Sequence, residues 1–388
     1  MSTYRLQADI PKTFLHGTRM MRAAGILLFA VLLARTAYAE TETGTGKKSL
    51  KIISFNTWFG LDGKGVFRMG ELESGQKKEK RYQGLVAGLR EYDPDILFIQ
   101  EANPLPRYVR RLAKDVGMNE IHAVNNGGVR VGPVGIPTNL RMGIAILAKR
   151  GLKLKKVGTH RTSGAGIVSN FFCFHLSEVR VLLAGVVYPN DEPLYLFCLH
   201  THASVPDIDE YRNKLKELLA AQKISPGERE DYANRLASSF ARTEEDISRS
   251  IPYIKEITRD HGPFIVGGDF NAYPPVFPSM TEFIGGMQLI DSFAVANPHQ
   301  AGYTWDPSRN ANTKCDGADT WADGKVKNPL ERLQAHYDGT VHQRIDFIFL
   351  SNHFTPEDVL DSTLVFDEPY GGIYVSDHFG VMTEVAFR

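Results

Sequence analysis

Five short motifs of this chain place carboxylate, amide and imidazole side chains at the ends of apolar runs. They are SFNTW at 54–58, IQEAN at 99–103, LHTHAS at 199–204, GDFNAYP at 268–274 and SDHFGV at 376–381. The apolar runs are typical of strands, and oxygen ligands at strand ends suit a hard cation such as Mg²⁺. Histidines beside such a cation can transfer protons. Together the five motifs predict a metal-dependent active site.

The composition is that of an ordinary globular protein. The 388 residues are 43% hydrophobic and 23% charged, and Lys+Arg and Asp+Glu both number 45. This balance disfavours a dedicated nucleic-acid binder, in which a basic surface is the usual footprint, but leaves open a local basic groove.

The N-terminal region has the pattern of an export signal. Arg22 precedes an apolar core at 23–34, and a small-x-small site follows at 37–39. We therefore expect 1–39 to contain a signal peptide that is cleaved before Glu40, so that the mature protein is secreted or periplasmic. The alternative is an uncleaved anchor, although the apolar core is shorter than the roughly 20 residues that span a bilayer.

After a polar linker at 40–48, short apolar runs alternate with segments of helical spacing. The expected strands lie at 50–56, 95–100, 143–148, 179–188, 194–200, 263–268, 345–350 and 379–387. The sequence PNDEP separates the fourth run from the fifth, which predicts an antiparallel hairpin. Strands with covering helices predict two packed sheets flanked by helices.

The segment 207–260 is charged and helical, without strand signals. Ser225 and Glu228 have the spacing of a capping box around a proline, and four isoleucines between 247 and 257 give one apolar face. These helices either cover one side of a sheet, which we favour, or form a lid over the active site.

The five motifs, in this order from about Lys51 to the C-terminus, resemble the endonuclease/exonuclease/phosphatase superfamily of metal-dependent phosphoesterases. The resemblance implies a four-layered α/β sandwich of two mixed β-sheets flanked by helices, with a catalytic domain at 49–388. It also implies Mg²⁺ as the cofactor, for which Mn²⁺ can substitute. Glu101 would be the main metal ligand, Asn56 would assist metal or phosphate binding, and Asp377 would contact the metal site or His200.

The same resemblance implies roles for four residues in catalysis. His378 would be the general base on the attacking water, while His200 would stabilise the phosphate oxygens or assist the leaving group. Asp269 would orient the water or the metal, and Asn271 would bind a phosphate oxygen.

Asp346 matches the carboxylate that orients the base histidine in this superfamily. The alternative is a structural salt bridge with the neighbouring Arg344. His202, two residues after His200, lies outside the usual catalytic position, and we interpret it as accessory or structural.

Within the superfamily, the sphingomyelinase-like branch is the most similar, through the sequences LLAGVVYPNDEPLYLFCLHTHA and GYTWDPSRN. This resemblance implies an enzyme that hydrolyses a phosphodiester by in-line attack of water, on a lipid head group at a membrane surface. We expect the protein to be a monomer. The alternative is a secreted DNase-like endonuclease that acts on DNA. A phosphoester-binding protein without turnover is a third hypothesis.

Two apolar segments are candidates for contact with a membrane. The sequence VGPVGIP at 131–137 is apolar and rich in proline and glycine, and GIVSNFFCF at 166–174 is apolar throughout. Either segment can also belong to the core, and for 166–174 we favour the core.

Overall fold

The structure is a computed structural model that describes residues 49–387 apart from 170, 207, 260–261, 315–336 and 338. Ser49–Phe387 form one compact unit. The predicted signal peptide and linker lie outside the described residues. Within the described part of the chain, no helix is long and apolar enough to cross a membrane.

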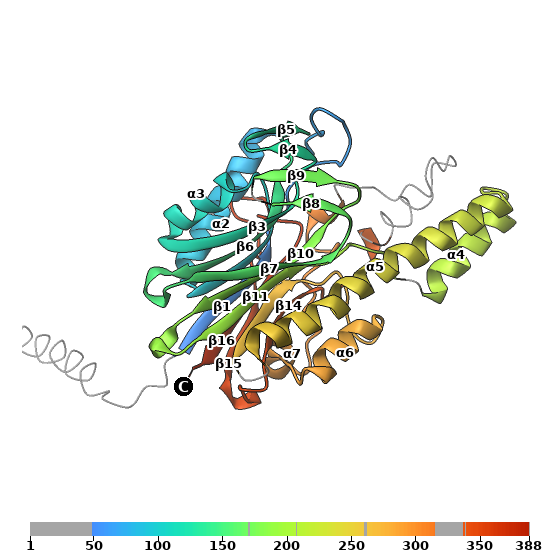
Figure 1. Ribbon diagram of the computed structural model, residues 1–388. Coiled ribbons are helices and arrows are strands. Elements are labelled where there is room, and N and C mark those ends of the chain that lie inside the picture. The colour runs from blue at the N-terminus through green and yellow to red at the C-terminus, as the bar shows by residue number, and fades with distance from the viewer. Residues whose placement is uncertain are drawn as a thin grey trace, which may run out of the picture. The chain divides into compact units, whose positions relative to one another are not determined.

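Two six-stranded sheets form the centre of the fold (Figure 1). The first has the order β15 (Val359–Val365), β16 (Gly380–Ala386), β1 (Ser49–Asn56), β2 (Ile96–Ala102), β6 (Met142–Lys149) and β3 (Met118–Asn126). The second has the order β13 (Ile290–Asp291), β14 (Asp346–Leu350), β12 (Phe264–Asp269), β11 (Leu194–His200), β10 (Arg180–Val187) and β7 (Lys155–Ser163). The pairs β1–β2 and β11–β12 are parallel, and the other pairs are antiparallel, so both sheets are mixed.

Helices cover the outer face of each sheet. α2 (Gly75–Tyr92) and α3 (Arg107–Val116) pack on the first sheet, while α5 (Pro226–Thr258) and α6 (Pro278–Gly286) pack on the second. A third group of buried side chains, drawn from both sheets, fills the space between them. Each central strand is therefore buried on both faces, which explains its continuous apolar sequence. The predicted four-layered sandwich is confirmed.

The two sheets approach closely at Gly267 in β12. A side chain at this position would meet the ring of Phe98 in β2, since a Cβ atom would lie 2.2 Å from the nearest ring carbon. Phe98 is fully buried in the core between the sheets. The glycine therefore lets the catalytic ends of β2 and β12 lie near each other.

The eight strands expected from the sequence are all present, and the predicted hairpin is the antiparallel pair β10–β11. Four further strands form a small third sheet that the sequence did not predict, in the order β5 (Val134–Ile136), β4 (Val129–Val131), β9 (Phe172–His175) and β8 (Gly166–Val168). The remaining short elements are α7 (Ser292–Ala296) and 3₁₀ turns at Arg150–Leu152, Pro189–Asp191, Ala311–Lys314 and Pro356–Asp358.

The predicted helical segment forms α4 (Asp209–Ala220) and the long helix α5. Ser225 and Glu228 make the expected capping box. Ile247 and Ile254 in the C-terminal half of α5 are fully buried against the second sheet, as expected for a helix that covers it. The N-terminal half of α5 packs with α4 around a separate small core.

The preference for 166–174 as a core segment is wrong. Ile167, Phe171 and Phe174 are exposed, and Cys173 alone is buried among the described residues of this segment. The reason is that the segment forms β8 and β9, and the apolar side chains on one face of the third sheet point to solvent.

Candidate active site

Strand direction brings the motif residues to one edge of the sandwich. Asn56 and Glu101 lie at the C-terminal ends of the parallel strands β1 and β2, and His200 and Asp269 lie at the ends of the parallel strands β11 and β12. Asp346 begins the antiparallel strand β14 directly opposite Asp269. Residues distant in sequence therefore meet because their strands end together.

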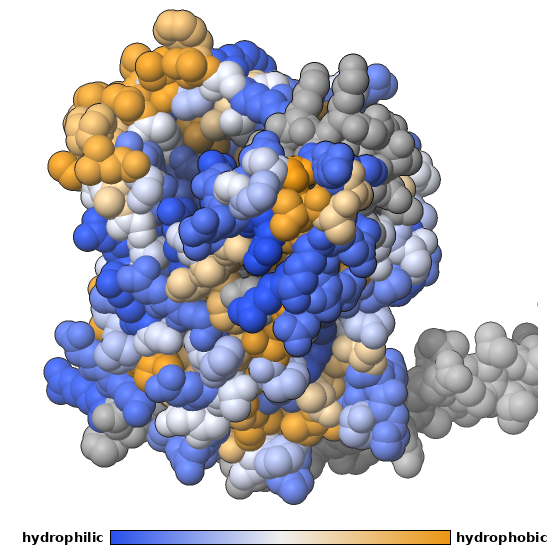
Figure 2. Space-filling view, turned by 90° about the vertical axis from the view of Figure 1, so that its right-hand side faces the viewer, coloured by the Kyte–Doolittle hydropathy of each residue, from blue (hydrophilic) through white to orange (hydrophobic). Residues whose placement is uncertain are grey.

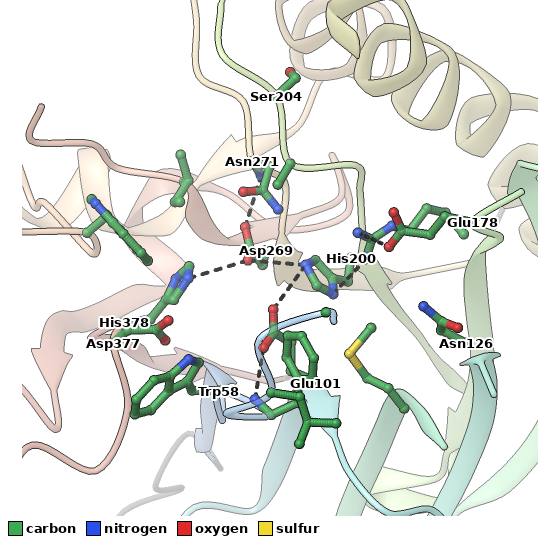
Figure 3. A pocket seen from close by; sticks show the side chains of 18 of the residues that line it. Trp58, Glu101, Asn126, Glu178, His200, Ser204, Asp269, Asn271, Asp377 and His378 are labelled. Carbon is green, nitrogen blue, oxygen red and sulfur yellow. Dashed lines mark hydrogen bonds and ion pairs between the residues drawn. The ribbon is translucent and has the colours of Figure 1, made fainter. Parts of the chain in front are cut away.

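A cavity of about 560 Å³ lies at this edge. Six of the eight candidate residues line it: Glu101, His200, Asp269, Asn271, Asp377 and His378 (Figure 3). The other two, Asn56 and Asp346, lie behind the lining. The amide of Asn56 donates to Asp269 Oδ2 at 2.9 Å, and its oxygen accepts from the backbone of Trp58 at 3.0 Å. Asn56 therefore orients Asp269.

Three residues that line the cavity adopt left-handed backbone conformations that are uncommon outside glycine. The φ angles of Trp58, Glu101 and Asn271 are 52°, 56° and 44°. Glu101 also lies where the pairing of β2 with β6 shifts register between Ile99 and Ala102. Such conformations cluster at functional sites, where a bulge redirects a side chain.

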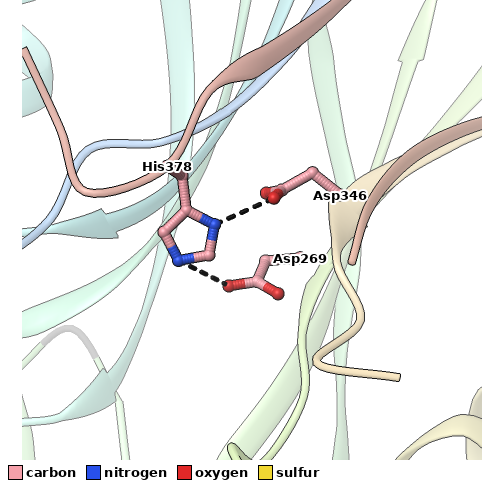
Figure 4. A group of neighbouring side chains, drawn as sticks. All are labelled: Asp269, Asp346 and His378. Carbon is pink, nitrogen blue, oxygen red and sulfur yellow. Dashed lines mark hydrogen bonds and ion pairs between the residues drawn. The ribbon is translucent and has the colours of Figure 1, made fainter. Parts of the chain in front are cut away.

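His378 is held by a carboxylate behind it (Figure 4). Its Nδ1 lies 2.8 Å from Asp346 Oδ2, and its Nε2 faces Asp269 Oδ2 at 3.8 Å. An ionised carboxylate only accepts hydrogen bonds, so Nδ1 carries a proton and Nε2 is directed into the site. The alternative salt bridge between Asp346 and Arg344 is wrong, because Arg344 pairs with Asp291 at 2.8 Å.

The cavity concentrates negative charge in a buried place. Burial raises the pKa of Glu101, and burial together with the charge of Asp346 raises the pKa of Asp269 to about 7. Burial alone would lower the pKa of His378, but Asp346 and Asp269 outweigh it and raise that pKa well above its usual value. Burial is thus the main cause of the raised carboxyl pKa values, and the neighbouring carboxylates add to it.

The residues present fit a divalent cation. Potential ligand atoms of Asp269, Asp346 and His378 lie within 4.8 Å of one another, and Asp346 Oδ1 is buried without a hydrogen-bond partner among the described residues. Glu101 offers a carboxylate whose Oε2 accepts from the backbone of Phe59 at 2.9 Å. Hard oxygen donors in such a cluster suit Mg²⁺ or Mn²⁺.

Arg180, which the sequence analysis did not identify, fixes the tautomer of His200. Its Nη1 lies 3.1 Å from His200 Nδ1, and its Nη2 pairs with Glu178 at 2.6 Å. A guanidinium group only donates, so Nδ1 of His200 accepts and the neutral ring carries its proton on Nε2. Burial, and then the charge of Arg180, lower the pKa of His200 well below its usual value.

The proton on His200 Nε2 is directed toward the carboxylates of the site. Nε2 lies 3.5 Å from Asp269 Oδ2 and 3.8 Å from Glu101 Oε1. His200 is thus a preorganised neutral donor. The signal for Arg180 in the sequence was a single basic residue at the start of the apolar run at 179–188.

Replacement of Arg180 with methionine is expected to remove the contact that fixes the tautomer of His200. The value of kcat should fall about tenfold or more, because that is the effect of losing a hydrogen bond to a charged group. The ¹⁵N chemical shifts of His200 report the tautomer directly, and the exposed Arg161→Met variant is the control. A large loss of kcat with unchanged His200 shifts would contradict this positioning role.

His202 lies apart from the cavity lining. Its backbone N–H donates to Asp246 at 2.9 Å, and its Nε2 lies 3.5 Å from Glu178. Burial lowers the pKa of His202 to about 4, so the ring is neutral at pH 7. These contacts fit an accessory or structural residue.

Comparison with known proteins identifies the family. Residues 53–378 match the Endonuclease/Exonuclease/phosphatase family. A search of curated proteins gave no match. Among solved structures, truncated TDP2 from Caenorhabditis elegans is 15% identical with a TM-score of 0.53, and the alignment covers 87% of this chain and 98% of that one.

Two structures from Bacteroides thetaiotaomicron are similar to the same extent. An endonuclease/exonuclease/phosphatase family protein is 16% identical over 88% of this chain and 98% of its own, with a TM-score of 0.52. A mannosyl-6-phosphatase is 16% identical over 87% of this chain and all of its own (100%), with a TM-score of 0.51. Similarities at this identity support the fold alone. The family match covers all eight candidate residues, and the chain belongs to the Endonuclease/Exonuclease/phosphatase family of phosphoric ester hydrolases.

Proposed function

We propose that the protein is an exported, Mg²⁺-dependent phosphodiesterase that attacks a lipid phosphodiester with water, as a sphingomyelinase or phospholipase C does. The observation that carries the chemistry is the His378–Asp346 pair, which faces Asp269 across one buried cavity. A histidine oriented by a carboxylate is the arrangement of a general base.

Each side chain has a separate role in the proposed reaction. A bound cation would offset the carboxylate charge that raises the pKa of His378, so that its Nε2 would be free to take the proton of the attacking water. Asp346 holds Nδ1–H and stabilises the imidazolium that forms. Nε2–H of His200 and the amide of Asn271 donate to the phosphoryl oxygens as negative charge builds on them. Glu101 and Asp377 would hold Mg²⁺ or Mn²⁺, while Asn56 orients Asp269 from behind the lining. The cation would supply positive charge that offsets the repulsion between the water oxygen and the phosphodiester.

The described lining of the cavity lacks a row of basic residues of the kind that holds a nucleic-acid strand. A groove for nucleic acid is lined by basic residues that contact phosphates along the strand. Among the described lining residues, two are basic apart from histidine, and five are acidic: Lys64 and Arg180 against Asp62, Glu101, Glu178, Asp269 and Asp377. Exposed apolar side chains near the cavity instead suit a membrane surface.

An assay of the purified protein with Mg²⁺ tests this proposal. Sphingomyelin, phosphatidylcholine, single-stranded and duplex DNA, and a sugar phosphate monoester are offered in parallel, with His378→Ala as the control for contaminating activity. We expect release of a phosphorylated head group from lipid. Efficient cleavage of DNA without lipid hydrolysis would overturn the lipid substrate and favour the endonuclease. Efficient release of phosphate from the monoester alone would favour a phosphatase, and binding without turnover of any substrate would favour a non-catalytic protein.

Export has its own test. If 1–39 contains a cleaved signal, the protein recovered outside the cytoplasm should begin at Glu40, which N-terminal sequencing determines directly. A mature protein that begins at Met1, or one retained in the cytosol, would contradict export without affecting the chemistry.

A further inference from the structure

The third sheet has the reverse of the usual burial pattern. In β4, Arg130 is buried while Val129 and Val131 on either side are exposed, and in β5 Val134 and Ile136 are exposed. In β8 and β9, Ile167 and Phe174 are exposed. We call these six apolar residues, Val129, Val131, Val134, Ile136, Ile167 and Phe174, the outer face.

Strand pairing makes the outer face continuous. Ile136 lies opposite Val129, Val129 lies opposite Phe174, and Phe174 lies opposite Ile167, so four apolar side chains form one row across all four strands. Side chains that lie opposite each other on one face of a sheet are close enough to make contact. Figure 2 shows a broad apolar area at the upper end of the molecule, where Figure 1 places β4, β5, β8 and β9.

Arg130 fixes the register that turns the apolar side chains outward. Its guanidinium group donates to the backbone oxygens of Pro133, Pro137 and Leu140 at 2.9–3.0 Å from the inner side of the sheet. A slip by one residue would bury Val129 and Val131 but would expose Arg130 and break these bonds. The outer face is therefore a stable feature of the fold.

A neighbouring loop joins the outer face to the rim of the cavity. Val66 and Phe67 are 72% and 74% exposed, and the backbone oxygen of Phe67 accepts from the N–H of Thr138, just after β5, at 2.7 Å. Three residues before Phe67, Lys64 lines the cavity. One loop therefore carries both the exposed Val66–Phe67 tip and Lys64, which lines the cavity.

We propose that the outer face and the Val66–Phe67 tip dock into the surface of a lipid bilayer and hold the cavity at the level of the head groups. This inference rests on the proposed lipid substrate.

The basic residues around the outer face also favour a lipid bilayer as its partner. Lys64 and Arg68 bracket the Val66–Phe67 tip, and Arg68 also pairs with Glu71. Arg161 donates to the backbone oxygen of Gly166 at the start of β8 at 3.0 Å. An apolar surface bordered by basic side chains matches a bilayer, in which phosphates lie directly above the acyl chains.

Sedimentation with phosphatidylcholine vesicles containing phosphatidylserine tests the docking surface. Because Ser49–Phe387 form one compact unit, the chain from Glu40 can be used, which removes the N-terminal apolar segment from the experiment. All binding is measured in EDTA, so that hydrolysis does not change the vesicles.

The test variant combines Phe67→Ser with Phe174→Ser, and the matched control is Leu360→Ser, which removes a 51% exposed leucine from β15. Loss of two phenylalanine side chains that would insert into the bilayer should weaken vesicle binding about 100-fold or more, while the control should bind like the wild type. Activity on a short-chain soluble phosphodiester should be unchanged in all three proteins.

The outcomes separate this inference from the proposed function. Vesicle binding equal to that of the wild type in the double variant would overturn the docking surface. So would a wild type that ignores vesicles and instead forms a dimer that the double variant loses. Tight, variant-sensitive vesicle binding without hydrolysis of any lipid would support the docking surface and reject the proposed substrate.

Discussion

Replacement of His378 with alanine is expected to lower kcat by about 10²–10⁴-fold, the usual contribution of a general base. The loss should be similar on every substrate that the enzyme accepts, because the base acts on water and not on the leaving group. Steady-state kinetics on a lipid and on a soluble diester measure this directly.

Two further variants show that the effect belongs to the pair and not to a histidine as such. Asp346→Asn should also lower kcat, because the amide can donate to Nδ1 of His378 and so favour the wrong tautomer. The exposed His299→Ala should have no effect. A His378→Ala enzyme that keeps kcat within about threefold of the wild type would remove the general base from the mechanism, since such a base contributes much more.

Removal of divalent metal is expected to abolish activity, and Mg²⁺ or Mn²⁺ should restore it. Glu101→Gln should weaken metal binding by more than the roughly 10–100-fold that the loss of an outer-shell partner costs, because Glu101 offers direct ligand atoms. Isothermal titration calorimetry gives the affinity, and circular dichroism checks that the fold is intact. Full activity in the presence of a chelator after dialysis would contradict the metal site.

The same site predicts how stability depends on pH. Asp269 has a folded-state pKa of about 7, above its ordinary value of 3.8, so the metal-free protein should lose stability as pH rises from about 4 to about 7. Added Mg²⁺ should therefore raise the Tm more at pH 8, where the carboxylate is ionised, than at pH 5. Equal shifts at both pH values, measured by differential scanning calorimetry, would place the ion elsewhere.

The sequence by itself determined the central strands and the candidate residues at their ends. Strands such as β1, β2 and β12 are mostly buried on both faces, so their sequences are mainly apolar and stand out from the rest of the chain. Parallel neighbours end at the same edge of a sheet, so the polar residue after each run meets the others. Glu101 and Asp269 were recognised from their motifs and from the resemblance to the superfamily, and the parallel strands explain why they meet.

Only the tertiary structure decided which strands lie at the sheet edges. β3, β7 and β15 are edge strands, with one neighbour each. Their sequences mix polar and apolar residues because solvent reaches them, and the sequence analysis did not identify them. An edge strand depends on the neighbour that it pairs with more than on its own pattern.

The tertiary structure also decided the contacts of single side chains. The sequence left open whether Asp346 pairs with Arg344 or with His378, because the answer depends on β13 bringing Asp291 to Arg344. The β10–β11 hairpin was predicted, but the structure decided its register, in which Leu182 lies opposite Leu199 and Arg180 contacts His200. The outward direction of Phe174 depends on the buried guanidinium group of Arg130, so tertiary contacts, and not hydrophobicity, decide which apolar residues face the solvent.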